Sequence, residues 1–420
     1  GWAERPLSER VSLVQAGVAA IGAMNEEIVI ELAHQMGRPV RYGGEFGGFE
    51  ERANYMAKIA GEALAPIEVE DSSEFCRKIK RIPHGLVLVV APWNYPYMTA
   101  INTIAPALIA GNSVILKHSS QTLLVGERLE KAFHSVGIPK EVFVNVFLDH
   151  ETTTQLIAER AFDYVNFTGS VSAGKAIEFA ASGTFTGIGL ELGGKDPGYV
   201  MEDANLDAAV ETLIDGAMFN SGQCCCGIER IYVHESLYDA FVEKAVTIVN
   251  GYKLGNPLEP ETTMGPMANV RFANVVRNQI INAIKDGATA HIDPTSFPQD
   301  KDAYLMPQIL TNVTHDMDIM CEESFGPVVG IMSVKDDAEA VMLMNDSKFG
   351  LTASIWTKDQ ERAEKIADQI ETGTVFMNRA DYLDPGLCWT GCKDTGRGGG
   401  LSMIGYHNLT RPKSYHLKKL

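Results

Sequence analysis

Short apolar segments that alternate with helical segments are the feature of this sequence that most limits its fold. The apolar runs, rich in β-branched residues, cover residues 85–90, 113–116, 142–146, 164–167 and 187–192, and helical stretches such as 122–135 and 171–181 separate them. Strands that alternate with helices are joined by right-handed crossovers into a parallel sheet with both faces covered. The pattern predicts a doubly wound α/β domain whose ligands lie beyond the carboxyl ends of its strands.

A second alternating block follows the first. Its expected helices are residues 206–220, 236–250, 270–286, 338–345 and 360–370, and its expected strands are 231–234, 352–356 and 374–377. A chain of 420 residues has room for two or three domains. We therefore expect a second α/β domain after the first.

Two polar segments, residues 67–82 and 414–420, alternate apolar and charged side chains. This alternation suits exposed strands better than core strands. The first segment predicts a hairpin, and the second predicts another extended edge. Neither has an evident partner in its own domain, so we expect both to pair with another subunit.

Residues 82–116 contain no Asp, Glu, Lys or Arg, which resembles a membrane span. Four prolines and two glycines interrupt the stretch, and lipid offers no partners for a backbone broken that often. We interpret it as buried core. The formal net charge of −18 also disfavours nucleic acid and anionic membranes as partners.

The seven cysteines show no regular spacing, and a chain of this length does not need disulfides for stability. This usage predicts a reducing, cytoplasmic compartment. Cys224, Cys225 and Cys226 are consecutive, and neither a histidine nor a second Cys-x-x-Cys pair lies at ligand spacing. Because adjacent thiols cannot all face one ion, we expect no metal site.

Four segments have the residue types of a catalytic site. In FNSGQCCCGIER, residues 219–230, a cysteine between two glycines is either an activated nucleophile or a small buried side chain. Glu191 ends an apolar strand and is either solvated or held as a base. The strand, turn and helix of residues 165–174 suit a phosphate, although an ordinary turn fits equally well. Asn94, in APWNYP, is either an amide donor for an oxyanion or part of a rigid turn.

Together these segments resemble the aldehyde dehydrogenase superfamily. The matching motifs, in family order and with family-like spacing, are APWNYP at 91–96, VILKHSSQT at 114–122, FTGS at 167–170, ELGGKDP at 191–197, FNSGQCCCGIER at 219–230, EESFGPV at 322–328 and NDSKFGL at 345–351. The resemblance covers nearly the whole chain.

The resemblance implies a catalytic role for three residues. Cys225 matches the nucleophile that attacks the aldehyde carbonyl and forms a thiohemiacetal. Asn94, with the backbone N–H of Cys225, matches the oxyanion hole. Hydride transfer to the nicotinamide leaves a thioester, and Glu191 matches the general base that activates the hydrolytic water. The covalent intermediate separates oxidation from hydrolysis, so each barrier can be lowered by itself.

The resemblance also implies NAD or NADP as the cofactor. The expected cofactor-binding residues are Trp93, Lys117, Ser120, Gly169, Ser170, Glu323 and Phe325. Lys117 matches the contact to the adenine-side ribose, and Ser170 matches the pyrophosphate contact. Glu323 and Phe325 match the residues that hold the nicotinamide ribose and ring. NAD-preferring members usually carry a glutamate at the position of Ser120, so NADP should be tolerated here.

The expected substrate pocket consists of Tyr95, Met98, Asn102, Phe219 and Cys224. Succinic-semialdehyde members place arginines at the positions of Asn102 and Phe219, where they hold the carboxylate of the substrate. Their replacement disfavours a small acidic aldehyde. We therefore expect an uncharged, apolar or aromatic aldehyde.

The resemblance implies an α/β fold with a Rossmann-like cofactor domain, an α/β catalytic domain and a small β oligomerisation element. The expected boundaries are 1–66 and 83–192 for the first, 193–403 for the second, and 67–82 with 404–420 for the third. The chain is expected to form a homodimer or homotetramer. Two alternatives stay open, a CoA-acylating aldehyde dehydrogenase and a non-catalytic dinucleotide-binding protein. Cys224 and Cys226 are either inert or able to form a disulfide with Cys225.

Overall fold

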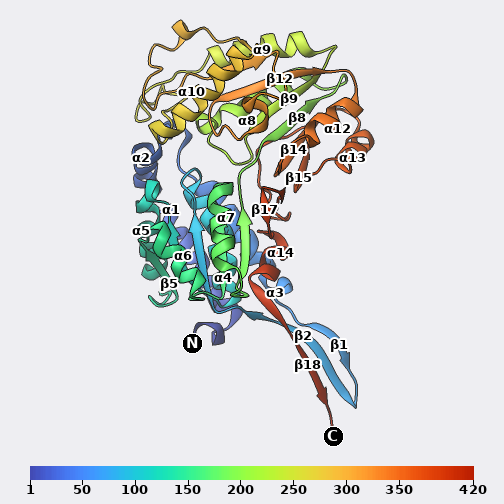
Figure 1. Cartoon of the computed structure of the whole chain (residues 1–420). Coiled ribbons are helices and arrows are strands. Elements are labelled where there is room, and N and C mark those ends of the chain that lie inside the picture. Colours follow the sequence, from blue (N-terminus) through green and yellow to red (C-terminus); the bar gives the residue numbers. More distant parts are fainter.

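The computed structural model describes residues 1–420 and consists of two α/β units with a projecting three-stranded arm (Figure 1). Each unit is built on one main sheet, of six strands in the first unit and seven in the second. The arm extends from the first unit, on the side away from the second.

The first sheet has the order β17-β7-β6-β3-β4-β5. Its strands are β3 (Leu86–Ala91), β4 (Ser113–His118), β5 (Phe143–Val146), β6 (Tyr164–Thr168), β7 (Gly187–Glu191) and β17 (Gly396–Arg397). All neighbours run parallel except β17, which pairs antiparallel with β7. The chain builds outward from β3 to β5 and then returns to β6 on the other side of β3. This reversal confirms the predicted doubly wound fold, and it places the loops after β3 and β6 at a topological switch point.

Helices cover the first sheet. They are α1 (Leu7–Gly22), α2 (Asn25–Met36), α3 (Phe46–Ala63), α4 (Pro96–Ala110), α5 (Leu123–Ser135), α6 (His150–Ala158), α7 (Val171–Ala181) and α14 (Ser402–Asn408). Helix α4 lies in the uncharged stretch and is buried over almost its whole length, as expected of core. No single helix of the chain is long and apolar enough to cross a bilayer, although α1 and α2 meet that test together as a bent pair.

The second sheet has the order β10-β11-β12-β9-β8-β14-β15. Its strands are β8 (Asp196–Val200), β9 (Ile228–His234), β10 (Thr289–Ala290), β11 (Gln308–Thr311), β12 (Val328–Val334), β14 (Thr352–Trp356) and β15 (Thr374–Met377). Its helices are α8 (Leu206–Met218), α9 (Tyr238–Asn250), α10 (Val270–Lys285), α11 (Asp318–Cys321), α12 (Asp337–Asn345) and α13 (Gln360–Ala367). The pair β13 (Phe349–Gly350) and β16 (Cys392–Lys393) lies outside both sheets.

Four strands of this sheet, β8, β10, β11 and β12, were not expected from the sequence. Strand β8 is fully buried but begins Asp-Pro-Gly, and these residue types are depleted in strands. Burial between its neighbours, which no local pattern shows, makes it a strand. The expected helix 206–220 is also too long, because α8 ends at Met218 and the chain then turns sharply.

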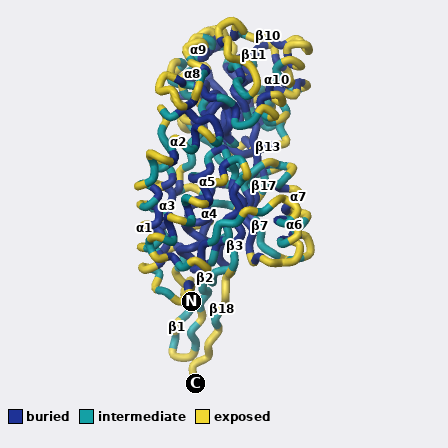
Figure 2. The backbone as a smooth tube through the Cα atoms, turned by 90° about the vertical axis from the view of Figure 1, so that its left-hand side faces the viewer, coloured by how far each residue is buried: buried dark blue, intermediate teal, exposed yellow.

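The arm corrects the expectation that both polar segments lack a partner within the chain. Strands β1 (Ile67–Asp71) and β2 (Phe75–Pro83) form the predicted hairpin, and β18 (Thr410–Lys418) pairs antiparallel with β2 along its whole length. Alternation identifies an exposed strand but carries no information about its partner. The arm is largely half-buried or exposed in Figure 2, and its free edges are now β1 and β18.

Candidate active site

A cavity of about 330 Å³ lies where the two units meet. It is lined by α3 and α4 from the first unit and by α8 and the cysteine segment from the second. Both Cys225 and Glu191 lie on its wall. The residues expected in the substrate pocket also line it: Tyr95, Met98, Asn102, Phe219 and Cys224.

A strained turn carries the cysteine segment to the cavity. Asn220, Ser221 and Gly222 all have left-handed backbone conformations, with φ of 54°, 55° and 69°. The Ser221 hydroxyl donates to the Gly265 carbonyl at 2.8 Å, and a Cβ on Gly222 would lie 2.1 Å from the Gly326 carbonyl oxygen. Such backbone strain persists only where the surroundings enforce it, and it concentrates at functional sites.

A buried hydrogen-bond network holds Asn94 beside this turn. The Asn94 amide donates to the Gln223 carbonyl at 3.3 Å, and Asn220 donates to both the Gln223 and the Asn94 carbonyls. Arg38 donates to the Asn94 carbonyl at 2.6 Å and forms an ion pair with Glu45, also at 2.6 Å. The loop after β3 is thereby fixed to the segment that ends in Cys225.

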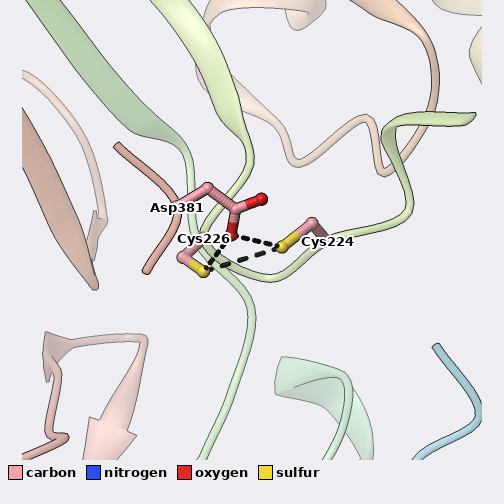
Figure 3. Close-up of side chains that lie close together, drawn as sticks. All are labelled: Cys224, Cys226 and Asp381. Carbon is pink, nitrogen blue, oxygen red and sulfur yellow. Dashed lines mark hydrogen bonds between the residues drawn. The ribbon is translucent and has the colours of Figure 1, made fainter. Parts of the chain in front are cut away.

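Two of the three consecutive thiols converge on one carboxylate. Cys224 Sγ and Cys226 Sγ lie 3.6 Å apart and donate to the same oxygen, Asp381 Oδ1, at 3.1 and 3.0 Å (Figure 3). The sequence predicted no metal site because adjacent thiols cannot all face one ion, but it did not show that this alternate pair converges with a carboxylate. The neighbouring Cys224 and Cys226 side chains hold the pKa of the Cys225 thiol well below its usual range. A depressed thiol pKa is the condition for a nucleophilic cysteine at neutral pH.

Glu191 ends β7, where it pairs with Thr168 of β6 and Gly396 of β17. Burial, with a smaller contribution from the neighbouring Cys225, raises the pKa of the Glu191 carboxyl to about 7, and Arg52 and Thr168 oppose the shift. A carboxylate with a pKa near the working pH is suited to accept a proton and release it again.

The expected cofactor-binding residues occupy the carboxyl edge of the first sheet. Lys117 lies near the end of β4, is 6% exposed and forms no salt bridge. Ser120 is exposed at the start of the 3₁₀ turn that follows. Gly169 and Ser170 form the turn between β6 and α7, and the Ser170 hydroxyl caps α7 by accepting from the Ala173 N–H at 3.3 Å. A buried lysine without an ion pair and a helix N-terminus, both at this edge of the sheet, fit the parts of a phosphorylated ligand.

The second unit contributes Glu323 and Phe325 to the same region. The Phe325 ring packs edge-on against Trp93, with centroids 5.6 Å apart. Glu323 accepts from the Gly194 N–H at 3.2 Å, and burial raises the pKa of its carboxyl to about 8. The structure thus brings Trp93 and Phe325 together across the two units.

Two residues that support the loop carrying Glu323 and Phe325 were not identified from the sequence. Lys195 and Glu229 form a buried ion pair at 2.6 Å, and the Glu229 carboxylate accepts the N–H groups of Ser324 and Phe325, each at 2.8 Å. Lys195 lies within the motif ELGGKDP, and Glu229 lies within FNSGQCCCGIER. The available signal for their burial was a charged residue in or next to a strand-forming segment, Glu229 in β9 and Lys195 just before β8.

A third residue missed by the sequence analysis is Arg52, which lines the cavity from α3. Phe49, Arg52, Ala53 and Met56 form one buried stripe on this helix. An arginine on an otherwise apolar stripe was the signal that a buried cation was present. The expectation of an uncharged substrate considered only Asn102 and Phe219.

Comparison with known proteins identifies the family. The model of the aldehyde dehydrogenase family matches residues 1–415. The chain belongs to this family. As a member it is an NAD(P)-dependent aldehyde dehydrogenase, as the motifs indicated.

Relatives support the same conclusion over the whole chain. A succinate-semialdehyde dehydrogenase [NADP(+)] of Deinococcus radiodurans is 32% identical over 98% of this chain and 86% of its own length. A betaine aldehyde dehydrogenase of Bacillus subtilis is 34% identical over 87% of this chain and 74% of its own. Among solved structures, the NAD+ complex of an aldehyde dehydrogenase from Bacillus cereus superposes with a TM-score of 0.95, covers 100% of this chain and 85% of its own, and is 29% identical.

Proposed function

We propose that this aldehyde dehydrogenase works through a covalent intermediate on Cys225, with Asn94 and Glu191 as its partners. The observation that carries the proposal is that Cys225 and Glu191 line one cavity with pKa values shifted in the directions their roles require. The lowered pKa of the Cys225 thiol favours its thiolate form, and the pKa of the Glu191 carboxyl is raised to about 7. Perturbed pKa values of neighbouring groups in one cavity are typical of catalytic sites.

The first step is attack of the Cys225 thiolate on the aldehyde carbon, which forms a C–S bond and leaves an alkoxide. The Asn94 amide, held beside Gln223 by the Arg38 network, donates to this oxyanion together with the Cys225 N–H. Both donors are fixed before the charge develops, so little reorganisation is needed in the transition state.

The residues at the carboxyl edge of the first sheet fit a dinucleotide. Lys117 is buried without an ion-pair partner, and the capped start of α7 presents N–H groups where a pyrophosphate would lie. Trp93 and Phe325 supply an aromatic wall for the nicotinamide end. NAD(P)+, when bound, accepts the hydride from the alkoxide carbon, which becomes a thioester on Cys225.

In the second step Glu191 takes a proton from water as the water attacks the thioester. The C–S bond breaks, the carboxylic acid leaves, and the Cys225 thiolate is restored. Hydrolysis rather than acyl transfer to CoA follows from the position of Glu191 in the cavity.

The test is to identify the product and the nucleophile. With purified enzyme, NADP+ and an aldehyde, we expect one free carboxylic acid per NADPH, and no acyl-CoA when CoA is added. Cys225→Ala should abolish oxidation, whereas Cys76→Ala, on the arm strand β2, should not. Accumulation of acyl-CoA, or turnover by Cys225→Ala, would refute the mechanism.

We also propose the finer organisation of the protein. The dinucleotide is bound by residues 1–66 and 83–192, and the nucleophile comes from residues 193–403. Two elements near the end of the second range still belong to the first unit, because β17 pairs within the first sheet and α14 packs on α3 and α4. The arm joins subunits into a homodimer or homotetramer, because Ile67, Val69 and Leu417 leave apolar side chains more than half exposed on it. Seven free cysteines are consistent with the cytoplasm. Light scattering of the purified protein tests the assembly.

A further inference from the structure

Arg52 is a buried cation without a partner on the wall of the cavity that holds Cys225 and Glu191. Its side chain is 7% exposed, and its guanidinium donates only through Nη1, to the Met98 carbonyl at 2.9 Å and more weakly to Asn102 Oδ1 at 3.4 Å. No carboxylate lies within salt-bridge distance, whereas the equally buried Arg38 is paired with Glu45. A buried charge is costly unless it is paired, so the Nε and Nη2 donors lack the acceptor that their position requires.

A second unmatched donor lies beside the first. Asn102 is 2% exposed, lines the same cavity, and its Nδ2 has no hydrogen-bond partner. Buried polar groups are almost always paired, so an unsatisfied one calls for an explanation. Arg52 and Asn102 together offer charge and N–H donors to one corner of the cavity, and no group of the chain accepts from the free ones.

Two of the four acidic residues that line the cavity have donors of their own. Asp381 accepts from the thiols of Cys224 and Cys226, and Glu51 accepts from the Tyr382 hydroxyl at 2.9 Å. Burial raises the pKa of Asp381 and that of Asp215, which favours their neutral forms. The remaining acidic residue, Glu191, acts on Arg52 only from beyond salt-bridge distance, so the free donors of Arg52 and Asn102 still lack a negatively charged acceptor.

We propose that Arg52 and Asn102 form an anion subsite and that the physiological substrates are aldehydes with a carboxylate at the far end. The inference rests on the proposed function in one respect, because it takes the aldehyde carbon to lie at Cys225. It reverses the expectation of an uncharged substrate. That expectation rested on the absence of arginine at positions 102 and 219, but α3 delivers a guanidinium to within 3.4 Å of the Asn102 side chain.

The first test compares succinate semialdehyde with butanal, which has the same number of carbons and no charge. Wild type should show the higher kcat/KM for the acid. Arg52→Met should reduce the ratio of the two kcat/KM values by about 10- to 100-fold, mainly through KM of the acid, as expected for the loss of charge-assisted hydrogen bonds. Arg5→Met, which removes a surface arginine paired with Glu9, should keep the wild-type ratio.

The rival role for Arg52 is to act through Glu191, whose pKa it lowers. In that case Arg52→Met would slow both aldehydes equally and shift the pH dependence of kcat upward for both. An unchanged ratio with such a shift would overturn the anion subsite.

A double variant tests the geometry. Arg52→Met with Asn102→Arg supplies the guanidinium from α4 instead of α3, and the preference for succinate semialdehyde should return. A double variant that melts like wild type but retains the low ratio would contradict the placement of the carboxylate in this corner.

Binding can be measured without turnover. Succinate, titrated calorimetrically into Cys225→Ala with NADP+ present, should bind, and adding Arg52→Met should weaken binding at least about tenfold. If wild type oxidises no aldehyde but succinate still binds through Arg52, the proposed function fails and the subsite stands. If aldehydes are oxidised without preference and succinate does not bind, the subsite alone fails.

Discussion

The side-chain amide of Asn94 donates to the backbone carbonyl of Gln223 at 3.3 Å, and that carbonyl also accepts from Asn220 at 3.2 Å. The amide is therefore held close to the cysteine segment, while the segment itself has a second support. Removing the Asn94 side chain should leave the position of Cys225 largely intact. Substitution of Asn94 therefore tests the role of its amide without displacing the segment that carries Cys225.

Asn94→Ala should lower kcat by about 10²- to 10³-fold with little change in KM, because the loss of one oxyanion donor affects the transition state and not the bound aldehyde. Asn94→Asp, of the same shape but unable to donate when ionised, should be slower still. Steady-state kinetics with a saturating aldehyde measure both. A loss below tenfold for Asn94→Ala would remove Asn94 from the oxyanion hole.

The pH dependence of turnover should report Glu191. Its raised pKa, about 7, means that the carboxyl is protonated and unable to act as a base below that pH. Where hydrolysis limits turnover, kcat should fall about tenfold per pH unit below 7 and level off above it. Glu191→Gln should abolish this inflection and slow the steady state, while a burst of NADPH remains because the hydride step precedes hydrolysis. Loss of the burst with steady turnover intact would show that the assignment is wrong.

Ser120 should influence the choice between NADP and NAD. It is exposed two residues after the end of β4, and a glutamate at this position would repel a 2′-phosphate. Ser120→Glu should lower kcat/KM for NADP+ relative to NAD+ by at least about tenfold. Ser120→Gln has the same size without the charge and should change the ratio much less. Equal effects of the two substitutions would point to size and not charge.

The residues of the proposed catalytic centre could be named from the sequence because motifs carry them, whereas the residues that support them could not. Cys225, Glu191 and Asn94 lie in short segments with a distinctive order. Arg52 lies in an ordinary helical stripe of α3, and its position in the cavity depends on how α3 packs against α4, which local patterns do not encode. The pairing of β18 with β2 and the strand β8 were missed for the same reason, since long-range neighbours decide them.

The Arg38–Glu45 ion pair should be a main support of the site. Both side chains are at most 5% exposed, and Glu45 also accepts the N–H groups of Tyr97 and Met98 at the start of α4. Arg38→Met leaves a buried carboxylate unpaired and should cost about 3–5 kcal/mol of stability together with activity. Urea denaturation measures the loss. Adding Glu45→Gln should recover part of the stability, whereas additive losses would show that the pair is not coupled.

Oxidation should distinguish the roles of the three adjacent cysteines. Cys225 has the lowered pKa, so its thiolate is the one that peroxide converts to a sulfenic acid, with release of hydroxide. Cys224 and Cys226 are both buried within the same turn. Attack by either thiol on the Cys225 sulfenic acid releases water and forms a disulfide.

Inactivation of the wild type by peroxide should therefore be reversed by dithiothreitol. In the double variant Cys224→Ala, Cys226→Ala no resolving thiol remains, and peroxide should drive Cys225 to the sulfinic acid without recovery. Peptide mass spectrometry of the two proteins identifies the oxidation product of Cys225. Sulfinic Cys225 and no disulfide in the wild type would mean that the flanking thiols are inert.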